Sequence, residues 1–272
     1  MATRSRAADR QVGDQIAAVA AMLREAEDSG KPCPPILDLL PAGDVEAAYK
    51  VQQINIDHKI GSGRRLIGRK IGLTSVAVQR QLGVSEPDYG ALLSDMIVGD
   101  GETIAFDRLL QPKAEAEIAL ILGADLDMPS PNLADVLRAT AFVLPAIEIV
   151  ASRIQNWKIS LVDTIADNAS SGMFVLGTPA IRPEGFSFGD CAMELKLNDE
   201  VVSTGSGRAC MGNPLNAAAW LAAQMHALGT PLRAGEIIMT GALGPMTVVG
   251  PSSKVFASIE NLGTVSFNMG DQ

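Results

Sequence analysis

Aromatic residues, cysteine and histidine are scarce in this sequence. Aromatics make up 4% of the 272 residues, too few for the stacking platform that binds single-stranded nucleic acid. Three cysteines, at positions 33, 191 and 210, are odd in number and widely spaced, which fits neither a disulfide framework nor a zinc motif. We expect free, buried thiols in a reducing compartment. With His58 and His226 as its only histidines, the chain is not expected to hold a histidine-based metal site or catalytic triad.

Several targeting and binding signals are also missing. The apolar run after the basic first ten residues is broken by Asp14, Gln15 and Arg24, so it does not form a secretory signal. No charge-free apolar window reaches the length of a membrane span. The formal net charge of −9 argues against non-specific binding of nucleic acid. We therefore expect a cytoplasmic protein that binds neither nucleic acid nor membrane.

The pattern of elements predicts an α+β protein in two parts. Residues 1–63 form a helical region, with a frayed start over 1–10, one amphipathic helix over 12–28 and a second from Asp44 to about residue 60. From residue 64 onward, short strands, glycines and helices are mixed. Because they do not alternate strictly, a doubly wound sheet is not expected. No GxGxxG, P-loop or GxSxG motif is present, which excludes the common nucleotide-binding and α/β-hydrolase folds.

Two glutamates stand on one apolar stretch that predicts a strand, residues 111–122. Side chains two apart share a face of a strand, so Glu115 and Glu117 project together. Two like charges on a half-buried strand repel each other and are costly to desolvate. A hard divalent cation such as Mg²⁺ or Mn²⁺ would relieve both costs. The alternative is an edge strand with both glutamates in solvent, and this pair alone favours that alternative.

A third carboxylate changes that balance. Glu148 lies within the run Phe142–Val150, which is otherwise wholly apolar, and an isolated ionised glutamate there requires a partner. Glu115, Glu117 and Glu148 together are a candidate site for a hard metal ion with open positions for water or substrate.

Three further stretches carry candidate site residues. Lys70 lies between Gly68 and Gly72 on a short strand, where it could approach a ligand or be solvated. Asp88 lies in a predicted turn at residues 86–90 and could serve that turn alone. Residues 161–172 are a dense polar cluster typical of a loop that lines a site, although Asp and Ser there could also bond their own backbone.

Six motifs in this chain resemble those of a known family, in the family's order. They are Gly68–Ser75 (GRKIGLTS), Pro87–Gly90 (PDYG), Glu115–Ala119 (EAEIA), Pro145–Ile149 (PAIEI), Ala166–Gly172 (ADNASSG) and Gly241–Met246 (GALGPM). Together they are similar to the hydratase/decarboxylase branch of the fumarylacetoacetate hydrolase superfamily, and more narrowly to the 2-keto-4-pentenoate hydratases of aromatic meta-cleavage pathways. The resemblance covers nearly the whole chain after the first ten residues.

The resemblance implies a fold, a metal site and a reaction. The fold would be a mixed β-roll over residues 64–272, carrying the catalytic site, with the N-terminal helices packed outside. Glu115, Glu117 and Glu148 would hold Mg²⁺ or Mn²⁺, and Lys70 and Asp88 would be the acid/base pair. Ser170 or Ser171 would contact a small 2-hydroxy-dienoate or 2-keto acid. The family also implies a homo-oligomer, and association with a pathway aldolase or decarboxylase.

Three other functions remain open at this level. A decarboxylase acting on 2-oxohex-3-enedioate would share the metal motifs and release CO₂ instead of adding water. Hydrolytic C–C cleavage needs a positioned base, for which the few histidines offer little support. A non-catalytic pathway partner would not need the intact carboxylates or Lys70.

Overall fold

The structure, a computed structural model, describes residues 2–40, 44–75, 79 and 84–271. Its α-helices are α1 (Ala2–Ser29), α2 (Val45–Gly61), α4 (Leu133–Ala139), α5 (Leu161–Ala166) and α6 (Pro214–Ala227). Single 3-10 turns are η1 (Leu37–Leu39), η2 (Phe106–Arg108), η3 (Gln155–Trp157), η4 (Asn168–Ser170) and η5 (Gly207–Ala209). The longer strands are β1 (Leu66–Gly72), β2 (Asp88–Leu93), β5 (Lys113–Leu122), β6 (Thr140–Val150), β7 (Ser171–Leu176), β8 (Ala192–Leu197), β9 (Glu200–Ser206), β10 (Ile237–Ala242), β12 (Lys254–Ile259) and β13 (Gly263–Met269). The two-residue strands are β3 (Ile97–Val98), β4 (Thr103–Ile104) and β11 (Thr247–Val248).

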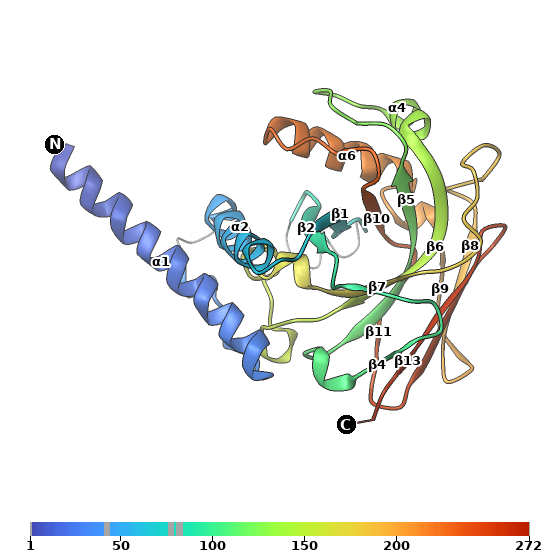
Figure 1. Cartoon of the computed structure of the whole chain (residues 1–272), viewed down its shortest axis with the longest axis horizontal. Helices are drawn as coiled ribbons and strands as arrows, with labels where there is room; N and C mark the ends of the chain where they lie inside the picture. Colours follow the sequence, from blue (N-terminus) through green and yellow to red (C-terminus); the bar gives the residue numbers. More distant parts are fainter. Residues whose placement is uncertain (1, 41–43, 76–78, 80–83, 272) are drawn as a thin grey trace.

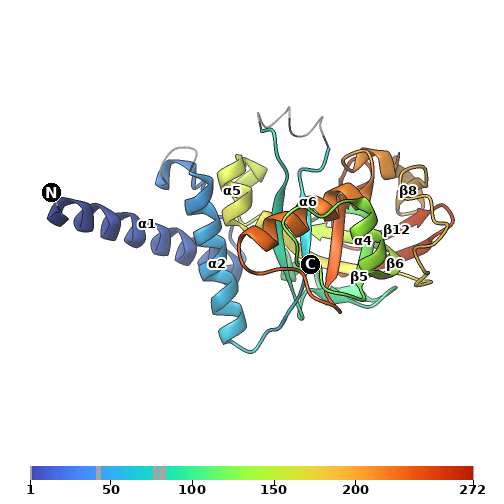
Figure 2. The same cartoon turned by 90° about the horizontal axis from the view of Figure 1, so that it is seen from above.

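These strands form two sheets that curl into a half-barrel (Figure 1). One has the order β2-β1-β10-β5-β6-β7-β3, with β11 paired to β5, and the other has the order β4-β13-β12-β8-β9. Helices α4 and α6 pack against one another, as the view from above shows (Figure 2). Helix α6 also packs against β10. The predicted α+β architecture is confirmed.

The candidate metal strand, β5, lies in the middle of its sheet. It pairs antiparallel with β10 on one side and with β6 on the other. Its residues from Ala116 to Leu120 are buried, because the sheet is covered on both faces. The alternative of an exposed edge strand is therefore wrong.

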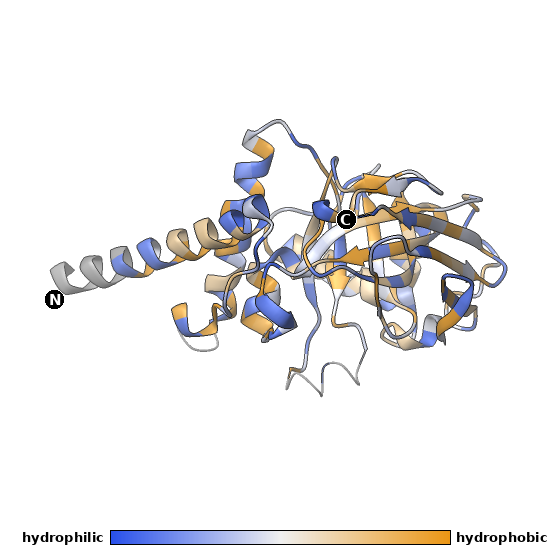
Figure 3. Cartoon of the chain, turned by 90° about the horizontal axis from the view of Figure 1, so that it is seen from below, coloured by the Kyte–Doolittle hydropathy of each residue, from blue (hydrophilic) through white to orange (hydrophobic). Residues whose placement is uncertain are grey.

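The N-terminal helices form their own apolar cluster beside the sheets. Helix α1 packs against α2, which in turn packs against α5, and Ile16, Val19 and Leu23 belong to the apolar cluster of these helices. Hydrophobic and hydrophilic residues alternate along α1 (Figure 3). The helix begins at Ala2, so the frayed start predicted over residues 1–10 is wrong. Alanine and arginine, which are frequent there, favour a helix once a longer segment behind them is anchored. The division of the chain at residue 63 stays a prediction.

Two local predictions also change. Asp88 begins β2 instead of serving a turn, because β2 pairs with β1 in the register Gly72 to Asp88. The predicted loop over residues 161–172 contains helix α5, which starts at a capping box formed by Ser160 and Asp163. A helix predicted from Thr74 to Leu82 lies mostly outside the described residues. Over the described ranges, no helix has both the length and the apolar character that a bilayer crossing requires.

Candidate active site and metal centre

Three glutamates meet on the neighbouring strands β5 and β6. Glu115 lies directly across from Glu148 in the antiparallel register, and Glu117 shares the face of Glu115 two residues further along β5. One carboxylate oxygen of each lies within 4.8 Å of the others. Glu117 and Glu148 are 0% and 1% exposed. The structure brings these three carboxylates together, two from β5 and one from β6.

The cluster is electrostatically strained as three bare carboxylates. Burial and then the charge of Glu148 raise the pKa of Glu115 to about 7 and the pKa of Glu117 well above its usual value. Burial also raises the pKa of Glu148, although the nearby Lys70 opposes the shift. Oε1 of Glu117 and Oε2 of Glu148 are buried without a hydrogen-bond partner. Oxygens of this kind are what a hard divalent cation binds, so the residues fit Mg²⁺ or Mn²⁺.

Lys70 is the cation that faces this cluster. It is 3% exposed on β1, and its Nζ lies 3.2 Å from Oε1 of Glu148. The same ammonium donates a hydrogen bond of 2.9 Å to the carbonyl of Ala169. Burial alone would lower the pKa of Lys70, but the carboxylates of Glu148 and Asp88 outweigh it and the pKa is raised. Lys70 is therefore an ammonium in this arrangement, not a solvated surface lysine.

Asp88 stands opposite Lys70 and depends on a glycine. It is 1% exposed, and burial raises its pKa although Lys70 and Thr164 oppose the shift. Its Oδ1 has no hydrogen-bond partner, and a Cβ at Gly72 would lie 2.1 Å from that oxygen. Only glycine at position 72 leaves room for Asp88 in this place.

A turn between α5 and β7 completes the pocket. Its residues Asn168, Ala169 and Ser170 all have left-handed φ values, 54°, 51° and 53°, a conformation that costs about 1–2 kcal/mol per non-glycine residue. The turn brings the Ala169 carbonyl to Lys70, and it places Oγ of Ser170 3.3 Å from Oγ1 of Thr164. Thr164 in turn donates a hydrogen bond of 3.2 Å to Oδ2 of Asp88.

The two candidate serines point to different places. Ser170 lines the cavity that contains Lys70, Asp88 and Glu115. Ser171 donates its hydroxyl hydrogen bond to the carbonyl of Asn168 at 2.7 Å and lines a separate cavity behind the turn. Thr164 was not singled out from the sequence, although it lies within the polar cluster at 161–172 that drew attention to this region.

The cavity has a volume of about 100 Å³. Its polar lining consists of the carboxyl groups of Asp88 and Glu115, the ammonium of Lys70 and the hydroxyls of Thr74, Ser75, Thr164 and Ser170. The rest of the wall is mainly apolar and is formed by Ile71, Leu73, Val150, Trp157, Ile159, Ala242 and Met246. Such a site can hold a small acid at a metal ion, with an ammonium and a carboxyl beside it for proton transfer.

Comparison with known proteins identifies the group to which this arrangement belongs. Residues 67–269 match the family model described as fumarylacetoacetate (FAA) hydrolase C-terminal. The chain belongs to the fumarylacetoacetate hydrolase family. Its region of similarity to this family includes all seven candidate site residues.

Individual relatives show to which members of the fumarylacetoacetate hydrolase family the chain is similar. The chain is 57% identical over 249 residues to 2-keto-4-pentenoate hydratase 2 of Dechloromonas aromatica, covering 92% of this chain and 95% of that one. It is 52% identical over 252 residues to 2-keto-4-pentenoate hydratase of Burkholderia vietnamiensis, covering 93% and 96%. The structure of 4-oxalocrotonate decarboxylase from Pseudomonas putida G7, complexed with magnesium and adipate, superposes with a TM-score of 0.91 at 33% identity, covering 94% and 97%. The predicted resemblance to the hydratase/decarboxylase branch is confirmed.

Proposed function

We propose that this protein adds water to 2-hydroxypenta-2,4-dienoate, by way of its 2-keto tautomer, and produces 4-hydroxy-2-oxopentanoate. The observation that supports this most directly is the buried group of three carboxylates facing Lys70 and Asp88, in a chain similar to hydratases over more than nine-tenths of its length. The substrate is a small acid, in keeping with the cavity volume of about 100 Å³.

The metal ligands in this proposal are Glu115, Glu117 and Glu148. Mg²⁺ or Mn²⁺ bound there would act as a Lewis acid toward the carboxylate and 2-oxygen of the substrate. Glu117 is held for this role by the backbone N–H of Gly241, which donates to its Oε2 at 2.9 Å. That bond leaves Oε1 of Glu117 free to bind.

The acid/base residues are Lys70 and Asp88. The dienol must lose the proton of its 2-hydroxyl and gain one at C5 to become the unsaturated 2-keto acid. Asp88, whose Oδ1 has no partner, accepts the first proton, and the ammonium of Lys70 supplies the second. Water then adds its oxygen to C4. In this step the neutral amine of Lys70 takes a proton from the water and the carboxyl of Asp88 gives its proton to C3, so one water is gained and both groups return to their starting states.

The hydroxyl groups and the apolar wall orient the substrate. Thr164 bonds both Asp88 and Ser170, so it fixes the carboxyl that moves the proton. Ser170 is the serine that we propose as a substrate contact, because it lines the cavity and Ser171 does not. The apolar side chains keep bulk water away from the reacting carbons.

A second candidate is decarboxylation of 2-oxohex-3-enedioate. The superposition on a 4-oxalocrotonate decarboxylase at a TM-score of 0.91 favours it. It would use the same carboxylates and would release CO₂ instead of gaining water.

One assay separates these functions. The purified protein would be mixed with freshly generated 2-hydroxypenta-2,4-dienoate, with Mg²⁺ or with EDTA, and the product would be weighed by mass spectrometry. Metal-dependent loss of the dienol with a gain of one water is the expected result. An untouched dienol, together with CO₂ release from 2-oxohex-3-enedioate, would contradict the hydratase and support the decarboxylase.

A further inference from the structure

Trp157 is held in the cavity wall by a hydrogen bond and a cation–π contact that have no role in the proposed reaction. Its side chain lines the cavity and is half-buried. Its indole Nε1 donates a hydrogen bond of 2.9 Å to the carbonyl of Gln111. The ammonium of Lys113 lies 4.1 Å from the centre of its ring, which is a cation–π contact. The ring is therefore held on its edge and on its face.

Gln111 holds the whole segment that carries Trp157. Its side-chain Nε2 donates to the carbonyls of Ser152 at 2.9 Å and Ile154 at 2.8 Å. Its Oε1 accepts the backbone N–H of Asn156 at 2.7 Å. With the indole bond to its own carbonyl, one residue makes four hydrogen bonds to residues 152–157.

The backbone of this arrangement is strained at three non-glycine positions. Gln111, Asn156 and Trp157 have φ values of 53°, 58° and 53°, in the left-handed region that side chains disfavour. Such conformations persist where the surroundings fix them, and they gather at ligand-binding sites. A simple surface turn would not need this strain, which points to a role for the position of the ring.

The position of the ring relative to the carboxylates follows from strand geometry. Lys113, Glu115 and Glu117 alternate along β5 and share one face. Each step of two residues is roughly 7 Å, so Lys113 and the ring that covers it lie one step outward from Glu115. An acid held at the glutamates by its first two carbons would point its remaining carbons into the space between the metal site and this wall.

The charges around that space are unfavourable for a second carboxylate. Among the described residues that line the cavity, Lys70 is the only cation, and it already faces Glu148 and Asp88. Lys113 is not among the residues that line the cavity, and its ammonium lies over the Trp157 ring. Apart from Lys70, Asp88 and Glu115, the described side chains that line the cavity are uncharged.

From these observations we infer that Trp157 is a specificity-determining residue that limits the substrate to a short, uncharged tail, with Gln111 and Lys113 as its positioning residues. This inference deepens the proposed function, and it rests on that function for the end by which the acid is held.

The test uses binding of saturated 2-oxo acids, which need no turnover. Calorimetric titration with Mg²⁺ present would compare 2-oxopentanoate with 2-oxooctanoate on the full-length protein. The wild type should bind the eight-carbon acid about tenfold or more weakly, the scale of discrimination that a hydrophobic pocket reaches. Trp157→Ala should remove that difference, and Gln111→Ala should reduce it.

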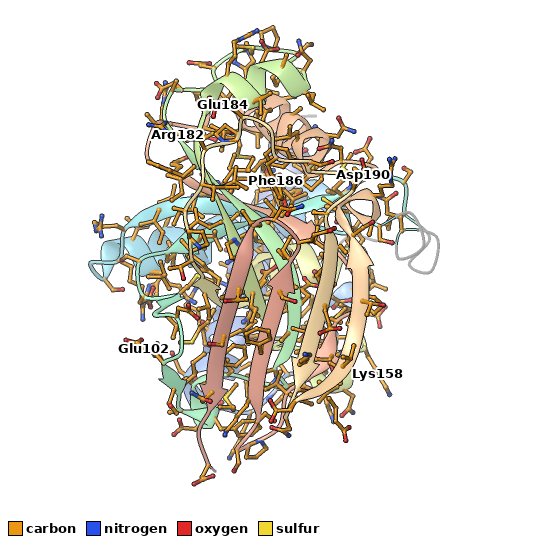
Figure 4. All side chains as sticks on the ribbon, turned by 90° about the vertical axis from the view of Figure 1, so that its right-hand side faces the viewer. Glu102, Lys158, Arg182, Glu184, Phe186 and Asp190 are labelled. Carbon is orange, nitrogen blue, oxygen red and sulfur yellow. The ribbon has the colours of Figure 1, made fainter. Side chains whose placement is uncertain are left out.

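Two further variants keep this test decisive. Trp157→Phe keeps an aromatic side chain and loses one ring and the N–H, so the protein should then also bind 2-oxohexanoate well. This variant provides the test if Trp157→Ala does not fold. Lys158→Ala is the matched control, because Lys158 is the next residue, is exposed and lies at the periphery of the molecule (Figure 4). An unchanged chain-length profile in both Trp157 variants would overturn the proposal, as would an equal change in Lys158→Ala.

A dicarboxylate supplies an independent readout. In Trp157→Ala the ammonium of Lys113 is uncovered, so binding of 2-oxoadipate should become at least tenfold tighter than in the wild type, a gain typical of a new charge-assisted contact. The double variant Trp157→Ala/Lys113→Ala should lose this gain and keep the gain for 2-oxooctanoate. A gain that survives the loss of Lys113 would contradict the role given to that lysine.

These outcomes are separate from those of the proposed function. If the wild type hydrates the pentadienoate but the Trp157 variants leave the chain-length dependence of binding unchanged, the proposed function is supported and the inference about Trp157 fails. If the wild type does not hydrate the dienol but the Trp157 variants change the chain-length dependence of binding, the role of Trp157 is supported and the reaction must be reassigned.

Discussion

Arg153 is joined to Asp167 by three hydrogen bonds directly behind the active-site turn. The backbone N–H of Arg153 donates to Oδ2 of Asp167 at 2.9 Å, its Nε donates to Oδ1, and its Nη2 donates to the Asp167 carbonyl at 2.7 Å. Its Nη1 reaches past the turn to the carbonyl of Ser171 at 2.8 Å. One buried guanidinium therefore fixes both ends of the left-handed turn at residues 168–170.

Removing Arg153 should destabilise the fold and the turn together. Arg153→Ala leaves the carboxylate of Asp167 buried without its partner, which costs about 3–5 kcal/mol in the free energy of unfolding. Urea titration followed by circular dichroism would measure it. The control is Arg208→Ala, which breaks the exposed pair with Asp190 and should cost about 1 kcal/mol or less. Equal losses in the two variants would show that Arg153 has no special structural role.

Neutralising one of the clustered carboxylates should stabilise the metal-free protein. Glu117→Gln keeps an oxygen for the N–H of Gly241 and removes one buried negative charge from the cluster. We expect a higher Tm than the wild type in EDTA, and loss of the rise in Tm that Mg²⁺ or Mn²⁺ gives the wild type. Scanning calorimetry with and without each ion would measure both. A variant that keeps the full response to metal would remove Glu117 from the ligand set.

Lys70 should be needed for turnover and not for metal binding. Lys70→Ala removes the buried ammonium opposite Glu148 and Asp88, so we expect a fall in kcat of about 10²–10⁴-fold, the usual contribution of a proton-transfer group. Metal binding, followed by calorimetry, should persist. Lys254→Ala, at an exposed lysine, is the control and should keep wild-type rates. Wild-type turnover in Lys70→Ala would exclude Lys70 from the mechanism.

Gly72 should not tolerate a methyl group. A Cβ at this position would lie 2.1 Å from Oδ1 of Asp88, so Gly72→Ala must displace that carboxyl. We expect a drop in kcat/KM of at least tenfold, because small displacements in an active site are costly to catalysis. Gly61→Ala is the matched control, because a Cβ there has no atom within 4 Å. Similar kinetics of the two variants would argue against the placement of Asp88.

The three thiols should be protected in the folded protein. All are buried and free, and burial raises the pKa of Cys33 to about 11 and of Cys210 to about 12. The thiolate is the reactive form, so it is almost absent at pH 8. Iodoacetamide followed by mass spectrometry should modify the native protein slowly and the urea-unfolded protein at all three positions. Rapid labelling of Cys210 in the native state would contradict its burial.

The metal cluster could be predicted from the sequence because its signal is local. Glu115 and Glu117 share a strand face through a spacing of two, and Glu148 is conspicuous in an apolar run. A sequence does not show strand register, so the pairing of Glu115 with Glu148, and the central position of β5 that excludes the edge strand, required the structure.

Other parts of the site depend on contacts between distant segments. Asp88 lies in a strand because β1 pairs with that strand. Thr164 reaches Asp88 because α5, which carries Thr164, packs against β2. The left-handed residues at 168–170 carry no glycine that would have marked them. Homo-oligomerisation and association with an aldolase or decarboxylase stay predictions, because they concern surfaces between chains.

Two separate parts of the fold hold the residues of the site in place: the central strands, and the apolar cluster of α1, α2 and α5. The three clustered glutamates are held by the central strands, whereas Thr164 lies on α5, whose neighbours Val162 and Ile165 pack among the N-terminal helices. Gln52 of α2 strengthens this link by donating to the carbonyls of Tyr89 and Ile165. Helical segments of this kind can open as a cooperative unit while a central sheet stays folded. Detachment of the N-terminal helices would then displace Thr164 from Asp88, while the central strands would keep the three glutamates together.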